Sequence, residues 1–195
     1  MCSNETDRNE VAGMKLEERE VREVTWILAV ILTCCAGWTD ARSRRIPNWL
    51  TVSGVAVGLT VNAIGAGWHG ALFSLEGMAV PLVLLLPPVL MRGLGAGDWK
   101  LMGSLGAIVG IERVLAVLFT TILLAGAVAI FLMIKQGRVL VTLRNMWEIL
   151  RGVFVFGVRP NPEVSLDSPN ATSLPFGVIA GLATVLCYCA GTLRS

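Results

Sequence analysis

Residues 114–134 read VLAVLFTTILLAGAVAIFLMI, an apolar stretch without a single charged side chain. A bilayer core of about 30 Å is crossed by about 20 residues of α-helix, so this stretch is long enough to span it. Hydrocarbon offers the backbone no hydrogen-bond partners, and a single segment must therefore bond internally as a helix. The stretch predicts a transmembrane helix in an all-α membrane protein.

The composition of the whole chain points the same way. Of 195 residues, 54% are hydrophobic and only 15% are charged, whereas a soluble domain has about 25% charged residues. A chain of this length cannot bury that much apolar surface in one aqueous core. The net charge of +2 is too small to indicate a nucleic-acid partner, so the expected surroundings are the lipid bilayer.

Outward from 114–134, charges, glycines and prolines divide the chain into about six predicted transmembrane helices. The segments are 24–39, 49–66, 71–91, 101–110, 114–134 and 174–193. The first and fourth are shorter than the bilayer requires, so flanking residues or local thinning must compensate. Pro87 and Pro88 are expected to break or kink the third segment.

Two polar regions flank or interrupt this membrane domain, which covers residues 24–195. Residues 1–23 hold seven acids and four bases with no apolar run, and are expected to form a polar tail rather than a signal peptide. Residues 135–173 mix bases with apolar residues and then become rich in proline. One interpretation is an amphipathic segment that lies on the inner leaflet and is followed by a loop. The other is a linker that has no function of its own.

Charge asymmetry between the loops predicts the orientation. With six spans, the loops after the first, third and fifth spans share one side of the membrane. These loops carry most of the bases: Arg42, Arg44, Arg45, Arg92, Lys100, Lys135, Arg138, Arg144, Arg151 and Arg159. By the positive-inside rule this side is cytoplasmic, in the inner (plasma) membrane of the cell, and both termini face outward.

Acidic residues in or beside the spans are candidates for function, because carboxylates are costly near hydrocarbon. Asp40 closes the first segment, and Asp98 precedes the fourth in the sequence Gly95-Ala96-Gly97-Asp98. Both are expected at the cytoplasmic interface, although depth alone does not bring them together laterally. Glu76, towards the outer half of the third segment, is interpreted as a packing or interfacial acid.

If Asp40 and Asp98 meet, the pair should hold one proton near neutrality, because two adjacent carboxylates do not both ionise readily. The ionised member can take a proton from water while the protonated member polarises a carbonyl. Such a pair requires no cofactor. His69 is the sole histidine and the five cysteines form no CxxC pair, so no metal site is expected.

Three motifs in this order resemble those of the type IV prepilin peptidase family, a family of GxGD membrane aspartic peptidases. The motifs are TDARSRRIPN from Thr39 to Asn48, GAGDWKLM from Gly95 to Met102, and LPFGV from Leu174 to Val178. Larger members of the family carry an insertion with two CxxC pairs after the first span, and this chain has no such insertion. The chain therefore looks like the short form associated with Flp/Tad-type pili or like the related archaeal preflagellin peptidases. N-methylation of the product is accordingly not expected.

The resemblance implies that Asp40 and Asp98 are the catalytic pair. It implies an aspartic endopeptidase that cuts the leader peptides of Flp-type prepilins or pseudopilins at the cytoplasmic membrane face, with pilus assembly components as further partners. Substrate-binding or supporting roles are expected for a further group of residues. These are Gly95, Gly97, Lys100, Arg45, Pro47, Asn48, Pro175 and Gly177.

Individual roles and rival functions stay open at this point. Lys100 could stabilise ionised Asp98, contact substrate carbonyls or reach the interface as a snorkelling lysine. Pro47 and Asn48 are expected to stop the first helix and cap the second. Two other functions are compatible with intramembrane acids: a small proton- or ion-coupled transporter, and a non-catalytic membrane subunit of a pilus or secretion system.

Overall fold

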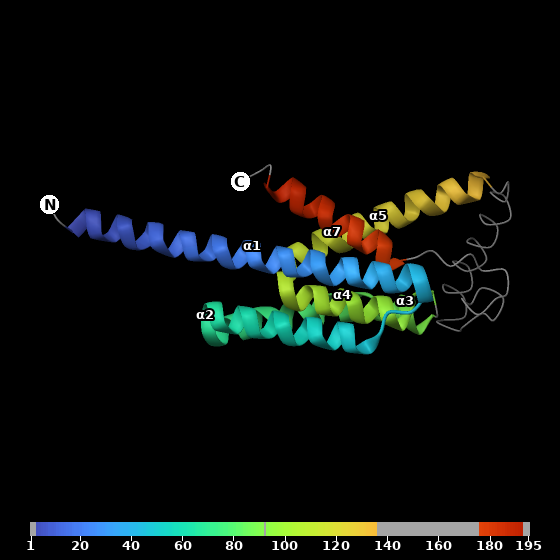
Figure 1. The fold of residues 1–195 in the computed structure, drawn as a ribbon, viewed down its shortest axis with the longest axis horizontal. Coiled ribbons are helices and arrows are strands. Elements are labelled where there is room, and N and C mark those ends of the chain that lie inside the picture. Colours follow the sequence, from blue (N-terminus) through green and yellow to red (C-terminus); the bar gives the residue numbers. More distant parts are fainter. Residues whose placement is uncertain (1–2, 92, 136–175, 193–195) are drawn as a thin grey trace.

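A computed structural model of the chain describes residues 3–91, 93–135 and 176–192, and its secondary structure over these residues is entirely helical (Figure 1). The helices are α1 (Ser3–Ser43), α2 (Asn48–Leu84), α3 (Leu86–Leu90), α4 (Ala96–Val109), α5 (Ile111–Lys135) and α7 (Phe176–Thr192). The prediction of an all-α fold is confirmed. The predicted segment 135–173 lies outside the described residues except for Lys135.

Helix α1 begins within the predicted polar tail and continues without a break into the apolar segment, so that its N-terminal part projects beyond the other helices (Figure 1). At the other end it continues past Thr39 to Ser43. Arg44 then adopts a left-handed backbone with φ of 51°, which ends the helix. Asp40 is therefore held in the last helical turn rather than in a loop.

Helix α2 is a hairpin of two antiparallel arms, 48–65 and 68–84. Between them Ala66 and Gly67 leave the helical conformation, and Gly67 has a positive φ of 59° that glycine adopts without strain. The Ser74 hydroxyl lies 3.3 Å from the Gly58 carbonyl oxygen, whereas sixteen residues of straight helix would separate them by about 24 Å. The two arms correspond to the second and third predicted spans.

The proline pair breaks the helix as predicted. Helix α2 ends at Leu84, and Pro87 and Pro88 fall in the first turn of the short helix α3, where a missing N–H is tolerated. The predicted cap of α2 is wrong in one detail: Pro47 occupies the N-cap position, without a side-chain cap. Asn48 is the first helical residue, and its side-chain oxygen accepts a hydrogen bond from Lys100 instead of capping α2.

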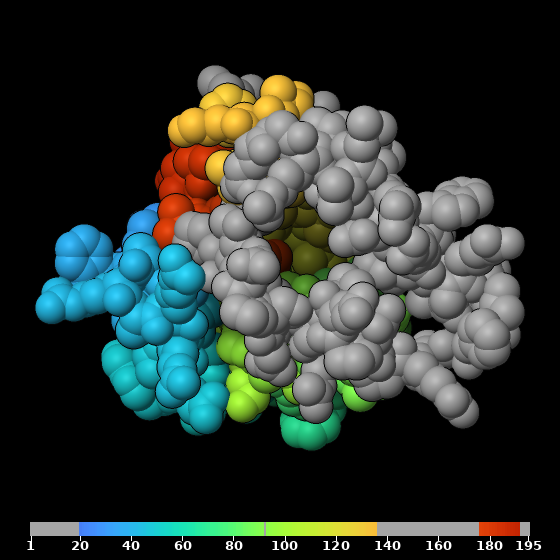
Figure 2. Space-filling view, turned by 90° about the vertical axis from the view of Figure 1, so that its right-hand side faces the viewer, coloured from blue at the N-terminus to red at the C-terminus, as the bar shows by residue number. Residues whose placement is uncertain are grey.

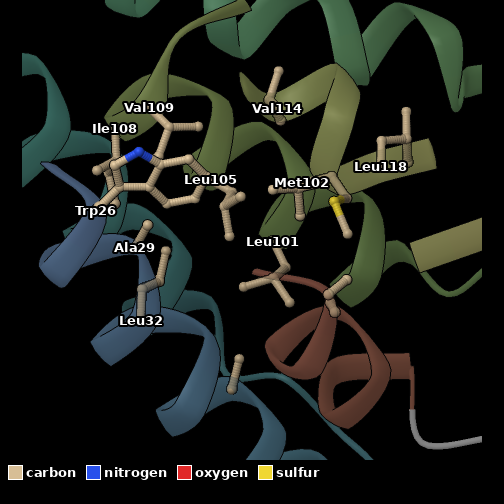
Figure 3. Close-up of a cluster of buried hydrophobic side chains, with 14 of the residues drawn as sticks. Trp26, Ala29, Leu32, Leu101, Met102, Leu105, Ile108, Val109, Val114 and Leu118 are labelled. Atoms are coloured by element: carbon tan, nitrogen blue, oxygen red, sulfur yellow. The ribbon is translucent and has the colours of Figure 1, made fainter. Parts of the chain in front are cut away.

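Helix α4 is the centre of the bundle, and every residue from Leu101 to Gly110 is buried. Leu101, Leu105 and Ile108 pack against Trp26, Ala29 and Leu32 of α1 (Figure 3). A helix that is apolar on all sides must be surrounded by protein or lipid. Here protein surrounds it, which explains how a helix of 14 residues can sit inside a membrane protein.

Small residues let the arms of α2 approach α4 closely. Gly77 of α2 faces Gly106 of α4 so tightly that neither position has room for a Cβ atom. A Cβ at Gly58 would lie 2.7 Å from the Ala107 carbonyl oxygen. Close backbone approach through glycine is a common mode of helix association in membranes.

A buried amide supplies the hydrogen bonds that the end of α4 lacks. The last carbonyls of a helix have no partner within it. The Asn62 side-chain amide donates to the carbonyl oxygens of Ala107 at 3.1 Å and Ile108 at 3.2 Å, and to the Ser74 hydroxyl at 2.9 Å. This polar contact fixes both arms of α2 to the C-terminal end of α4.

Three of the described helical segments are long and apolar enough to cross a membrane: Glu20–Ser43, Asn48–Leu84 and Ile111–Lys135. The apolar helix α7 is shorter, as is α4. Together with the all-helical fold, these segments make this a membrane protein. The number of crossings, six, stays a prediction, to which the hairpin of α2 contributes two arms.

Candidate active site

The C-terminal end of α1 and the N-terminal ends of α4 and α7 gather at one end of the bundle (Figure 1). Viewed from that end, the first residues of α7 lie beside the last residues of α1 (Figure 2). Asp40 and Asp98 are both at this end, one on α1 and one on α4. Helix direction explains the placement, because α1 ends where α4 begins.

Asp40 is buried, with 8% of its surface exposed. Its Oδ2 atom accepts a 2.8 Å hydrogen bond from the backbone N–H of Gly177, the second residue of α7. The free N–H groups at a helix N-terminus attract negative charge. The start of α7 therefore both orients the Asp40 carboxyl and offsets the cost of burying it.

Gly177 makes this contact possible because it has no side chain. A Cβ at this position would lie 3.0 Å from the Asp40 Cβ and 3.1 Å from the Ala36 carbonyl oxygen. A side chain would thus push α7 away from α1 and lengthen the hydrogen bond to Asp40. The preceding Pro175 lies outside the described residues.

Asp98 is the third residue of α4, three positions after the N-cap Gly95. Its carboxyl group hydrogen-bonds the Gly95 backbone, the contact that an acidic residue at this position of a capping box makes. A Cβ at Gly95 would lie 2.9 Å from the Asp98 Oδ2 atom. Gly95 thus leaves space for the carboxyl group to fold back over the helix end.

The two acids interact electrostatically. Asp98 precedes the apolar part of α4 and lies outside the three candidate membrane spans. Burial, and after it the charge of Asp40, raise the pKa of Asp98 from 3.8 to about 7, while the Gly95 hydrogen bond opposes the shift. The sequence left open whether these two carboxyl groups lie near each other laterally, and the fold places them close enough for the charge of Asp40 to affect Asp98.

Several of the predicted supporting residues lie near the start of α4. Lys100 donates a 3.0 Å hydrogen bond to the Asn48 side-chain oxygen, and Gly97 packs against Ile46, to whose Cβ a Cβ at Gly97 would come within 3.3 Å. The segment after Asp40 and the start of α4 therefore touch. Arg45 is exposed at the same end of the bundle, and Glu76 is exposed on the second arm of α2, away from this group.

Sequence reasoning missed two contacts that shape this end of α4. The Trp99 indole N–H donates a 2.7 Å hydrogen bond to the Leu82 carbonyl oxygen, near the C-terminal end of α2. Ile46 covers Gly97. The position of Trp99 beside Asp98 was noticeable in the sequence, but its partner 17 residues earlier had no local signal.

Fold and site together define a helical membrane protein in which two acids lie where three helix ends converge. The sequence matches the model of the type IV leader peptidase family over residues 26–130. This match covers more than half of the chain and contains Asp40 and Asp98, so the chain belongs to that family. No curated protein and no solved structure matches the chain. The chain is accordingly a membrane peptidase, and the resemblance seen in its motifs is confirmed.

Proposed function

We propose that this peptidase is an aspartic endopeptidase that removes the leader peptide of Flp-type prepilins or pseudopilins. Asp40 and Asp98 are its catalytic pair. The observation that carries the proposal is the placement of Asp40 and Asp98 at the same end of the bundle, where burial and the charge of Asp40 raise the pKa of Asp98 to about 7. Two acids of this kind are the minimal machinery for peptide hydrolysis by activated water.

In the proposed mechanism the two acids have different tasks. Asp98 holds the shared proton and donates a hydrogen bond to the scissile carbonyl oxygen. Asp40, oriented by the Gly177 N–H, enters as the carboxylate and takes a proton from the attacking water. Collapse of the tetrahedral intermediate returns a proton to the leaving amine, and no covalent enzyme intermediate forms.

The charges at this end of the bundle support cutting at the cytoplasmic face of the inner membrane. Exposed bases lie at the ends of the described helices on this side of the bundle and in their connections: Arg42, Arg44, Arg45, Lys100 and Lys135. An excess of bases is typical of the cytoplasmic side of a membrane protein. A precursor whose apolar helix lies in the bilayer would present its cleavage site at this depth.

A cleavage assay tests the proposal. The purified protein in detergent micelles is incubated with a purified Flp-type prepilin, and mass spectrometry locates the new N-terminus. Asp40→Asn and Asp98→Asn should each abolish the product, since each removes one half of the acid–base pair, while membrane insertion stays normal. Processing by either variant at the rate of the parent would exclude the acid pair as the catalytic group.

A further inference from the structure

Lys100 and Asn48 form a direct link between α4, the helix that carries Asp98, and α2, the helix that follows Asp40 in the sequence. The Lys100 ammonium donates a 3.0 Å hydrogen bond to the Asn48 Oδ1 atom, across a separation of 52 residues. Lys100 lies in the second turn of α4, just after Asp98, and Asn48 is the first residue of α2. The link therefore joins the start of α4 to the start of α2.

Asn48 is in turn closely tied to Asp40. Only Arg44, Arg45, Ile46 and Pro47 separate the end of α1 from Asn48. The connection is anchored at its beginning, where the Arg44 N–H donates a 2.8 Å hydrogen bond to the Asp40 carbonyl oxygen. It is anchored again by the contact of Ile46 with Gly97. A shift of Asn48 relative to Lys100 would consequently change the distance between the two acids.

Lys100 is poorly placed to act on Asp98 directly. Residues two apart on a helix point roughly 200° away from each other around the axis. The groups that shift the pKa of Asp98 are Asp40 and the Gly95 backbone, with burial, and Lys100 is not among them. The charge of Lys100 is engaged with Asn48 instead.

We propose that Lys100 is a positioning residue that acts through Asn48: its hydrogen bond fixes the start of α4 against the start of α2 and so sets the separation of Asp98 from Asp40. This inference rests on the proposed function of the acid pair. It replaces the three roles that the sequence left open for Lys100: stabilising ionised Asp98, contacting substrate carbonyls and reaching the interface as a snorkelling lysine.

The test is a double-mutant cycle in the prepilin cleavage assay. Lys100→Met removes the ammonium and keeps the length of the side chain, and Asn48→Leu removes the acceptor and keeps its volume. Each variant should lower kcat about tenfold with KM changed less than about twofold, because a small misplacement of catalytic groups costs mostly rate. The double variant should be no slower than either single variant.

Two further measurements separate positioning from a general loss of structure. The link is exposed, so thermal unfolding of the variants in micelles should match that of the parent. Amide hydrogen exchange over residues 96–100 should be faster in both single variants, a readout independent of substrate. Asn48→Asp keeps an acceptor for Lys100 and should lose less activity than Asn48→Leu.

Three results would overturn the inference. Multiplicative losses in the double variant would mean that Lys100 and Asn48 act separately. A raised KM confined to Lys100→Met would indicate substrate binding. A displaced pH profile in that variant would indicate a direct effect on Asp98. If the parent does not cleave prepilin, the proposed function is wrong. If the parent is active, Asp98→Asn is inactive, and the double-mutant cycle shows no coupling between Lys100 and Asn48, only this inference is wrong.

Discussion

The backbone N–H of Gly177 points at the Oδ2 atom of Asp40 from 2.8 Å, across 137 residues of sequence. This contact places the N-terminus of α7 against the last turn of α1, at the level where α4 begins. A buried carboxyl group near a bilayer needs such a partner, since an unpaired one would be strongly unfavourable. Helix α7 thus takes part in the acid site although it supplies no acid.

Gly177→Ala should lower kcat for prepilin cleavage by at least about tenfold, because displacing a catalytic group by a fraction of an ångström is enough to slow the reaction. The added methyl group would meet the Asp40 Cβ at 3.0 Å and the Ala36 carbonyl oxygen at 3.1 Å. Gly191→Ala on the same helix is the control, because a Cβ there has nothing within 4 Å. Equal rates for the two variants would show that the α1–α7 contact has no part in catalysis.

The cleavage rate should fall as the pH rises through about 7. The pKa of Asp98 is raised to about 7 by burial and by Asp40, so the group is protonated below that pH and ionised above it. The proposed mechanism needs the protonated form to polarise the scissile carbonyl. Measuring kcat from about pH 5 to about pH 9 should show the alkaline limb. A rate that rises steadily over this range would contradict the role given to Asp98.

Asp98→Asn should be more stable than the parent at neutral and alkaline pH. The folded protein binds the Asp98 proton up to about pH 7, whereas an unfolded chain releases it near 3.8. The folded state therefore loses stability as the pH rises between these two values, and asparagine removes the effect. The gain is at most about 4 kcal/mol above pH 7, at about 1.4 kcal/mol per pKa unit.

Thermal unfolding in micelles at pH 8 and at pH 4 measures this difference. The melting temperature of Asp98→Asn should exceed that of the parent at the higher pH and approach it at the lower one. The same offset at both pH values would mean that the charge of Asp98 does not destabilise the fold.

Asn62→Leu should destabilise the protein by about 1–3 kcal/mol, the usual cost of leaving buried polar groups without partners. The Ala107 and Ile108 carbonyl oxygens would lose the amide that they now share. Thr60→Val serves as the control, since the exposed Thr60 hydroxyl bonds only its own helix, at the Ala56 carbonyl oxygen among the described contacts. Chemical or thermal unfolding in micelles would distinguish the two variants.

The local features of the fold were predictable because each has a local cause. The turn between the arms of α2 lies at Ala66 and Gly67, where the predicted span 49–66 ends, because glycine accepts the backbone that a reversal needs. The break before α3 follows from Pro87 and Pro88. The cap of α2 was predicted wrongly, because the Asn48 side chain faces Lys100, a partner far away in the sequence.

Apolar runs, helix breakers and the three motifs by themselves determined an all-helical membrane protein, the family and the two candidate acids. Hydropathy and backbone preference act over a few residues. They fix where a helix starts, where it ends and how deep it lies in the membrane. Only the tertiary structure decided that Asp40 and Asp98 interact, that Gly177 orients one of them, and that Lys100 reaches Asn48. These contacts depend on which helix faces pack against each other, which is set by the shapes of surfaces brought together from distant parts of the chain.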